Sequence, residues 1–261
     1  MKKEIKYVIP SYNRADGVTT LDYVSKGKMY VSPQDYPNYI KHNARHKDKI
    51  VELPDRVQGK GKAHVQNWIL ENLWDDNTEA IIFLDDDITC LMGKVRNGKD
   101  YEIDESLFYE LVEDFVLLAQ EWGCAMFSFG INSDPMSYDE FKPFRCHSYL
   151  DGTLQGFVKK DTLRFDEELT VKEDVDMFLQ QIQKYHKALR IDKYYFKVKS
   201  FQGTGGSQAF RSVESEKKQF VMMQKKWGAD IIRPNKPTAK KASTIRSFGG
   251  AIKLNLPLKG V

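Results

Sequence analysis

The sequence lacks a long apolar run. None reaches the roughly 18 consecutive apolar residues that a membrane-spanning helix needs. The opening Met1-Lys2-Lys3-Glu4 leads straight into a strand-like segment and does not resemble a signal peptide. We therefore expect no membrane partner and a cytoplasmic location.

Cysteine is scarce as well. The three cysteines (Cys90, Cys124 and Cys146) are odd in number, widely spaced and without a CxxC pattern. This usage predicts reduced thiols in a cytosol and argues against a disulfide framework or a thiolate zinc site. The chain also has no internal repeat and no low-complexity linker, and its 261 residues suffice for one large domain or two small ones.

The small net charge of +3 hides a strong asymmetry. Residues 217–261 hold eleven Lys and Arg against one acid, a net charge of +10, which leaves 29 bases and 36 acids, or −7, in residues 1–216. A polyanionic partner for the C-terminal part would explain this pattern, although a solvated surface with no partner would also be compatible with it.

Strand and helix patterns alternate in the first third of the chain. Residues 5–9, 49–53 and 80–84 are apolar runs of strand length, and residues 34–44 and 62–73 have helical periodicity. Such alternation predicts an α/β fold with a parallel sheet covered on both faces. Ligands bind such sheets at the carboxyl ends of the strands, where residues 10–14, 54–56 and 85–87 fall.

The middle of the chain is mixed. Asn97-Gly98 predicts a hairpin between residues 88–95 and 101–103, and a long amphipathic helix follows at 104–122. We expect its buried stripe to contain Leu107, Leu111, Phe115 and Leu118. Further strands are expected at 125–129, 145–157 and 194–201, a helix at 172–187, and a loop at 203–207. We divide the chain into a catalytic domain, 1–216, and an irregular basic extension, 217–261, packed on it or continuing it.

Asp85-Asp86-Asp87 is the most informative motif. Three adjacent carboxylates repel one another and are costly beside a core unless a cation compensates them. Mg²⁺ or Mn²⁺ prefers oxygen ligands and binds through one or two carboxylates plus substrate phosphates. If the strand alternation continues through the run, Asp85 and Asp87 point one way and Asp86 the other. An acidic turn that caps the following segment is the simpler alternative.

The chain resembles a known group at this point. Val8-Ile9-Pro10-Ser11-Tyr12-Asn13-Arg14 is similar to the opening strand of GT-A nucleotide-sugar glycosyltransferases, and Phe83-Leu84-Asp85-Asp86-Asp87 to their DxD strand. The resemblance covers roughly residues 5–200 and implies a Rossmann-like, mainly parallel sheet and a nucleotide-sugar donor, which we take to be a UDP-sugar. It implies that Pro10, Ser11, Tyr12 and Arg14 hold the nucleoside.

For the acidic run, the resemblance implies that Asp85 contacts the ribose or the metal and that Asp87 ligates the metal, with Asp86 beside them at the donor. Gly59-Lys60-Gly61-Lys62 opens a helix, where two glycines allow close approach and two lysines attract phosphate. We expect Lys60 and Lys62 to bind the donor, although an exposed basic turn would have the same composition.

Glu173-Asp174 begins a predicted helix. Acids in a first helical turn also complement the helix dipole without any catalytic role. The segment is similar to the Glu-Asp element of inverting GT-A enzymes, in which the Asp deprotonates the acceptor hydroxyl. The resemblance therefore implies Asp174 as the base and Glu173 as its neighbour at the acceptor, with Asp176 as a second choice.

Two other elements of the GT-A pattern are less clear. Residues 152–157 correspond to the loop that lines the sugar and the acceptor, and Gln155 and Gly156 are candidates there. A late histidine is often a third metal ligand in this group, but the last histidine here, His186, lies in a predicted helix. We expect a structural role for His186 and a packed or surface role for His147, with water and diphosphate completing the metal coordination.

The acceptor follows from the basic tail. Its mixture of basic and aromatic residues, which include Phe220, Trp227 and Phe248, suits phosphate contacts with occasional base stacking. The general layout resembles the phage-type TET/JBP-associated glycosyltransferases, which implies hydroxymethylated pyrimidine in DNA as the acceptor, flipped out to reach Asp174.

Three alternatives stay open at this point. The enzyme could use the same donor on a bacterial polysaccharide or lipid-linked acceptor. The chain could be a non-catalytic nucleic-acid-binding module on a GT-A scaffold, but such a module needs neither acidic motif, and both would repel a polyanion. A metal-dependent nuclease or phosphotransferase would use an acidic cluster but would leave residues 10–14 unexplained.

Overall fold

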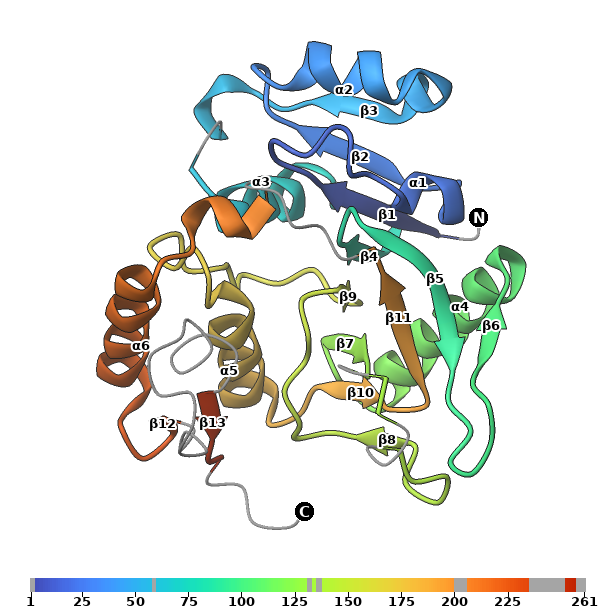
Figure 1. Ribbon diagram of the computed structural model, residues 1–261. Coiled ribbons are helices and arrows are strands. Elements are labelled where there is room, and N and C mark those ends of the chain that lie inside the picture. The colour runs from blue at the N-terminus through green and yellow to red at the C-terminus, as the bar shows by residue number, and fades with distance from the viewer. Residues whose placement is uncertain are drawn as a thin grey trace.

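A computed structural model describes residues 3–57, 60–130, 133–134, 138–199, 206–234 and 252–256 of the chain. A mixed eight-stranded sheet runs through its centre, in the order β3-β2-β1-β4-β9-β7-β10-β8 (Figure 1). Its strands are β1 (Glu4–Pro10), β2 (Lys28–Val31), β3 (Ile50–Glu52), β4 (Thr78–Leu84), β7 (Met126–Phe129), β8 (Phe144–Arg145), β9 (Leu154–Phe157) and β10 (Leu189–Ile191).

The sheet is mainly parallel. Strands β1, β2, β3 and β4 pair in parallel, as do β7 and β10, whereas β9 and β8 run against their neighbours. This confirms the predicted α/β fold with a Rossmann-like, mainly parallel sheet. Strand β2 was not predicted, because Lys28-Met29-Tyr30-Val31 is a short apolar run next to a lysine-rich turn.

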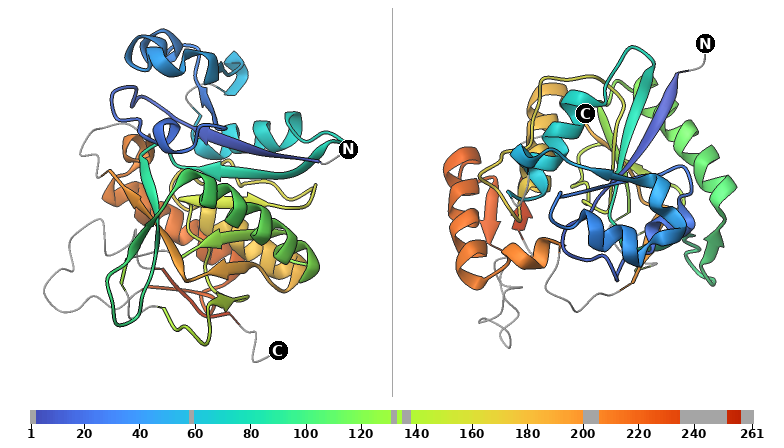
Figure 2. Two further views of the ribbon diagram at one scale, coloured as in Figure 1. Left: turned by 90° about the vertical axis from the view of Figure 1, so that its right-hand side faces the viewer. Right: turned by 90° about the horizontal axis from the view of Figure 1, so that it is seen from above.

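Helices cover both faces of the sheet. Helices α1 (Thr20–Tyr23), α2 (Tyr36–His42) and α4 (Glu105–Glu121) contribute to one apolar core, and α3 (Lys62–Asn72), α5 (Glu173–Tyr185) and α6 (Val213–Trp227) to the other. The view from above in Figure 2 shows α4 on one side of the sheet and α5 and α6 on the other. Strand β4 serves both cores, because Ile82 points into the first and Ile81 and Phe83 into the second.

Two small antiparallel sheets and three short 3₁₀ helices complete the described chain. Strand β5 (Ile88–Gly93) lies between β6 (Tyr101–Ile103) and β11 (Tyr194–Val198), as the predicted hairpin requires, and β12 (Ile232–Pro234) pairs with β13 (Ile252–Leu254). The 3₁₀ helices are η1 (Ala44–Lys49), η2 (Asp55–Val57) and η4 (Gly206–Phe210). No helix in the described ranges is long and apolar enough to cross a membrane.

The buried stripe of helix α4 is rotated from the predicted one, and Leu111 and Leu118 are only partly buried against the core. Leu107 is 39% exposed, whereas Phe108 and Val112 are fully buried; Phe115 is shared by both stripes. The segment has apolar side chains on more than half of its circumference, so periodicity alone does not fix which stripe faces the sheet.

The C-terminal part is more regular than predicted between residues 213 and 227. Helix α6 begins with a capping box in which the side chains of Ser212 and Ser215 each accept from the other's backbone N–H. The proposed boundary between residues 216 and 217 lies inside this helix. Phe220 and Trp227, expected to contact nucleic acid, are engaged within the protein: Phe220 is buried and the Trp227 indole N–H donates to Asp176.

Candidate functional site

A cavity of about 310 Å³ opens at the carboxyl ends of β1 and β4, a volume suited to a small ligand. Because β1 and β4 are parallel neighbours, the segments that follow them, Ser11–Arg14 and Asp85-Asp86, meet at one edge of the sheet. The first residues of α3 (Lys62) and of α5 (Glu173 and Asp174) line the same cavity. Its lining residues are Pro10, Ser11, Tyr12, Arg14, Ser32, Leu53, Val57, Gly61, Lys62, Val65, Asp85, Asp86, Asp151, Gly152, Thr153, Thr170, Val171, Glu173, Asp174, Gly206, Phe210 and Arg211.

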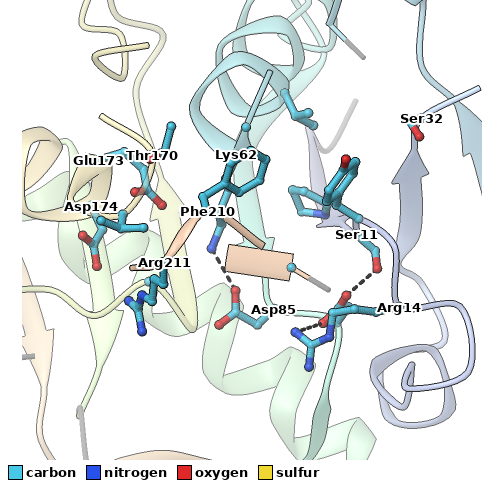
Figure 3. A pocket seen from close by; sticks show the side chains of 18 of the residues that line it. Ser11, Arg14, Ser32, Lys62, Asp85, Thr170, Glu173, Asp174, Phe210 and Arg211 are labelled. Carbon is cyan, nitrogen blue, oxygen red and sulfur yellow. Dashed lines mark hydrogen bonds and ion pairs between the residues drawn. The ribbon is translucent and has the colours of Figure 1, made fainter. Parts of the chain in front are cut away.

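The acidic run is held by two cations of the protein. Arg14 contacts both Asp86, at 3.0 Å, and Asp87, at 2.9 Å, and Asp86 also accepts a hydrogen bond from the Ser11 hydroxyl. Asp85 pairs instead with the Lys62 ammonium at 2.8 Å (Figure 3). The predicted alternation, with Asp85 and Asp87 on one side, is therefore wrong. Strand β4 ends at Leu84, so the pleat no longer sets the side-chain directions.

Lys62 connects the acidic run to the start of α5. Gly61, with φ of 105°, turns the chain into α3 and brings Lys62 to the first position of that helix. Burial disfavours the charge on Lys62, but Asp85, Glu173 and Asp174 outweigh it and raise its pKa. A Cβ added at Gly152 would lie 3.6 Å from Asp174 Oδ2 and 3.7 Å from Lys62 Nζ, so both groups border the space above this glycine.

The first two acids of α5, Glu173 and Asp174, have different surroundings. Asp174 accepts a hydrogen bond from the Tyr149 hydroxyl and another from the Val175 N–H at 2.7 Å. Glu173 is 7% exposed, and its Oε2 is buried without a hydrogen-bond partner among the described residues. Burial, and then the neighbouring Asp174, raises the pKa of Glu173.

Acids outnumber bases around the cavity. Five carboxyl groups line it against three basic groups, which gives a charge of −2 when all are ionised. The acids are Asp85, Asp86, Asp151, Glu173 and Asp174, and the bases are Arg14, Lys62 and Arg211. Burial raises the pKa of Asp86 to about 6 and also raises that of Asp151. A divalent cation would offset this excess when an anionic ligand binds.

The carboxylates fit such a cation in part. Asp85 lines the cavity with its side chain 35% exposed, and Asp151 lines the same space. Asp87, the expected direct ligand, is held by Arg14 and is not among the lining residues. Within the described ranges, no three His, Cys, Asp or Glu side chains are grouped to hold a metal. A cation here would therefore need ligand oxygens from a bound phosphate or water besides Asp85.

Comparison with known proteins identifies the family. The model of the TET-Associated Glycosyltransferase family matches residues 5–206. The chain belongs to this family. It is therefore a glycosyltransferase, in agreement with the prediction from the two motifs.

Similar solved structures are distant, and no curated protein matches the sequence. One is a 4-diphosphocytidyl-2C-methyl-D-erythritol synthase from Anaerococcus prevotii, with 13% identity, a TM-score of 0.43, and coverage of 77% of this chain and 92% of that one. Another is a glucosyl-3-phosphoglycerate synthase from Mycobacterium tuberculosis in complex with Mg²⁺ and UDP, with 10% identity, a TM-score of 0.47, and coverage of 85% and 79%.

Most of the residues predicted for the site of this glycosyltransferase line the cavity. They are Pro10, Ser11, Tyr12, Arg14, Lys62, Asp85, Asp86, Glu173 and Asp174. Lys60 is exposed and outside the lining. Of the predicted loop at 203–207, residues 203–205 lie outside the described ranges, and Gly206 lines the cavity.

Three other predicted site residues, Gln155, Gly156 and Asp176, contact the interior of the protein and do not line the cavity. Gln155 is buried in β9 and accepts from the Gln66 amide at 3.1 Å, and a Cβ on Gly156 would come within 2.2 Å of the Phe127 ring. Neither lines the cavity. Asp176, the second choice as base, is fully buried and accepts from Trp227 and Lys226 of α6, so it faces away from the cavity.

Several residues that line the cavity of the glycosyltransferase were not predicted from the sequence. Asp151 directly precedes the glycine of the loop singled out at 152–157, and its acidity was the available signal. Phe210 and Arg211 come from the segment before α6, which carries no motif; the Phe210 ring lies 5.8 Å from that of Tyr12. Figure 3 shows Arg211 directed toward the space between Asp174 and Asp85.

Proposed function

We propose that this glycosyltransferase moves a sugar, with inversion, from a UDP-sugar to the hydroxyl of a hydroxymethylated pyrimidine in DNA. One observation carries the proposal: Lys62, which suits a donor phosphate, and Asp174, which suits a proton acceptor, border the same space above Gly152. A direct displacement needs the leaving group and the base on opposite sides of one reacting carbon.

The donor half of the proposed site is the edge formed by β1 and β4. Pro10, Ser11, Tyr12 and Arg14 would hold the nucleoside, because they form the cavity wall after β1. Lys62 would bind the diphosphate, since its ammonium lies at the N-terminus of α3, where the helix dipole also favours an anion. Lys60, Gln155 and Gly156 stay weaker candidates for the donor.

The acceptor half is the start of α5. In the proposed step, the acceptor hydroxyl transfers its proton to Asp174 while its oxygen forms the new bond to the anomeric carbon. The bond from that carbon to the diphosphate oxygen breaks, and the nucleoside diphosphate leaves with the electron pair. Tyr149 and the Val175 N–H orient the carboxylate of Asp174. Glu173 would contact the acceptor or sugar hydroxyls through its unpartnered oxygen.

A divalent cation, Mg²⁺ or Mn²⁺, would supply positive charge to the leaving diphosphate. Asp85 is the side chain best placed to hold it, because it faces the cavity and is partly exposed. Asp87 could take part only after releasing Arg14, which now pairs with it. On the proposal, Lys62 shares the phosphate charge with this cation.

DNA as the acceptor is supported by the charge of the tail, where eleven bases face one acid in residues 217–261. We also propose that the protein is cytoplasmic and that its chain consists of a catalytic part, 1–216, and a basic extension, 217–261. Residues 235–251 and 257–261 of that extension lie outside the described ranges.

The decisive experiment incubates the protein with Mn²⁺ or Mg²⁺, a panel of UDP-sugars, and DNA with or without hydroxymethylated pyrimidines. Mass spectrometry of the digested nucleosides should find a hexose- or pentose-sized increment only on the hydroxymethylated base. Asp174→Asn should abolish transfer, because the loss of a general base lowers the rate by about 10²–10⁴-fold. The affinity for UDP should stay within about twofold, because the proposal assigns Asp174 to the acceptor and not to the donor. Asp48→Asn, at an exposed site in η1, is the matched control.

Two outcomes would count against the proposal. Normal turnover by Asp174→Asn would remove this residue as the base. Transfer to a glycan or lipid acceptor without DNA would replace the acceptor. The DNA contact itself is tested by salt: affinity should fall steeply between about 50 and 200 mM salt, and a flat response would contradict phosphate contacts by the tail.

A further inference from the structure

Helix α6 lies beyond residue 206, where the family match ends, yet it packs directly on the start of α5 (Figure 1). Phe220 and Met223 of α6 join the same apolar core as Phe178 of α5. The two helices are thus parts of one packed layer, and α6 reaches the short segment, residues 170–172, that leads into Glu173 and Asp174.

Gln219 of α6 satisfies three polar groups of that segment. Its Oε1 accepts from the N–H groups of Thr170, at 3.1 Å, and Val171, at 3.0 Å, and its Nε2 donates to the Thr170 hydroxyl at 2.5 Å. Gln219 is only 5% exposed, so water cannot easily replace it. Thr170 and Val171 themselves line the cavity.

The next residue is held by the same helix. Lys172 pairs with Glu216 at 2.5 Å, and both side chains are fully buried. Lys172 is also the N-cap residue of α5, and no side-chain hydrogen bond caps that helix. The direction in which α5 starts is therefore fixed from outside, by side chains of α6 that come 44 and 48 residues later.

We propose that Gln219 is a positioning residue of the transferase: it fixes Thr170 and Val171, and thereby sets where Glu173 and Asp174 meet the acceptor. The part of the chain after residue 206 then completes the catalytic site and is not only an acceptor-binding extension. This role rests on the proposed function of Asp174. Displacing a base by about an ångström is enough to cost about a hundredfold in rate.

The test uses the full-length protein with Gln219→Met, which keeps the side-chain size and removes the three hydrogen bonds. Gln224→Met is the matched control, because Gln224 lies on the same helix and, among the described residues, its side chain donates to the Ile232 carbonyl, away from the cavity. We expect Gln219→Met to lower kcat by about tenfold to a hundredfold, with the donor KM within about threefold. Gln224→Met should keep both values.

Gln219→Glu separates positioning from folding. A carboxylate can still accept from both N–H groups, and the Thr170 hydroxyl can turn to donate to it. We expect this variant to recover at least about a third of the wild-type kcat, by the same geometric argument. Equal kcat in Gln219→Met and the wild type would overturn the proposal. It would also be overturned if the control, Gln224→Met, lost as much kcat as Gln219→Met.

A readout independent of catalysis distinguishes this inference from the proposed function. In hydrogen exchange, the amides of Thr170 and Val171 should exchange at least about tenfold faster in Gln219→Met, whereas amides in the centre of β4 should not change. Unchanged exchange at these two amides would refute the positioning role of Gln219 even if transfer is observed. If the wild type transfers no sugar while these amides lose protection, the positioning contact stands and the proposed reaction fails.

Discussion

Replacing Lys62 by methionine should make stability more sensitive to pH. Lys62 lies 2.8 Å from Asp85 and also lowers the pKa values of Glu173 and Asp151, which burial raises. Methionine keeps much of the side-chain volume but removes the charge. The pKa values of Glu173 and Asp151 should therefore rise further in the variant.

The sign follows from the direction of these shifts. An acid whose pKa is higher in the folded state holds its proton more tightly there, so it favours folding at low pH and loses this contribution as pH rises through the folded pKa. Each further unit of pKa rise costs about 1.4 kcal/mol once the group is ionised. For a chain of this size, 1 kcal/mol moves Tm by roughly 2–4 °C. The Tm deficit of Lys62→Met should be several degrees larger near pH 8 than near pH 5, where the lost ion pair with Asp85 already contributes.

Thermal unfolding of the wild type and Lys62→Met from pH 5 to 8 checks this expectation. Lys41→Met, at an exposed position in the last turn of α2, controls for the loss of one surface charge. The difference between variant and wild type also cancels the contribution of Asp86, whose pKa of about 6 falls in the same range. Parallel Tm curves for the wild type and Lys62→Met would refute the idea that Lys62 compensates these carboxylates.

Three further substitutions test two residues that line the cavity, Glu173 and Gly152, and one residue of β9, Gly156. Glu173→Gln removes a buried acid whose pKa is raised, so its Tm relative to wild type should rise from pH 5 to pH 8 while transfer falls; a constant Tm difference would contradict this. Gly156→Ala should lose about 1–3 kcal/mol of stability, because its Cβ meets the Phe127 ring at 2.2 Å. Gly152→Ala should instead keep its Tm, because its Cβ has normal contacts. It should lose transfer, because this Cβ occupies the space between Lys62 and Asp174. Urea unfolding and the transfer assay distinguish Gly152→Ala from Gly156→Ala.

The sequence was sufficient for the elements that carry a strong local pattern. Strand β4 is a continuous apolar run that ends at three acids, and helix α5 begins at two acids. Both elements and their acidic motifs could therefore be located from the sequence. Helix α4 shows the limit of such patterns. Its existence was clear, but its buried face depends on how it packs on the sheet, which periodicity over a widely apolar helix does not determine.

Contacts distant in the sequence could not be predicted. Arg14 reaches Asp87 across 73 positions, and which carboxylate it takes depends on the pairing of β1 with β4 and on the turn after Leu84. Gln219 is one of two glutamines in a lysine-rich helix, and no sequence pattern around it marks it as a partner of Thr170. These contacts follow from tertiary packing, so sequence patterns gave the residue types of the site but not its full membership.

The ion pairs also give the acidic run a second physical role. Asp85, Asp86 and Asp87 are each paired with a basic side chain of the protein, so the run does not depend on a metal to be stable. The same pairs hold Lys62 and Arg14 at the edge of the sheet, with both side chains lining the cavity. A diphosphate entering there would compete with Asp85 for Lys62, and a displaced Asp85 would be left with an uncompensated charge. On the proposed function, binding of the donor and recruitment of a cation by Asp85 would be energetically coupled, because each would remove the cost that the other otherwise meets.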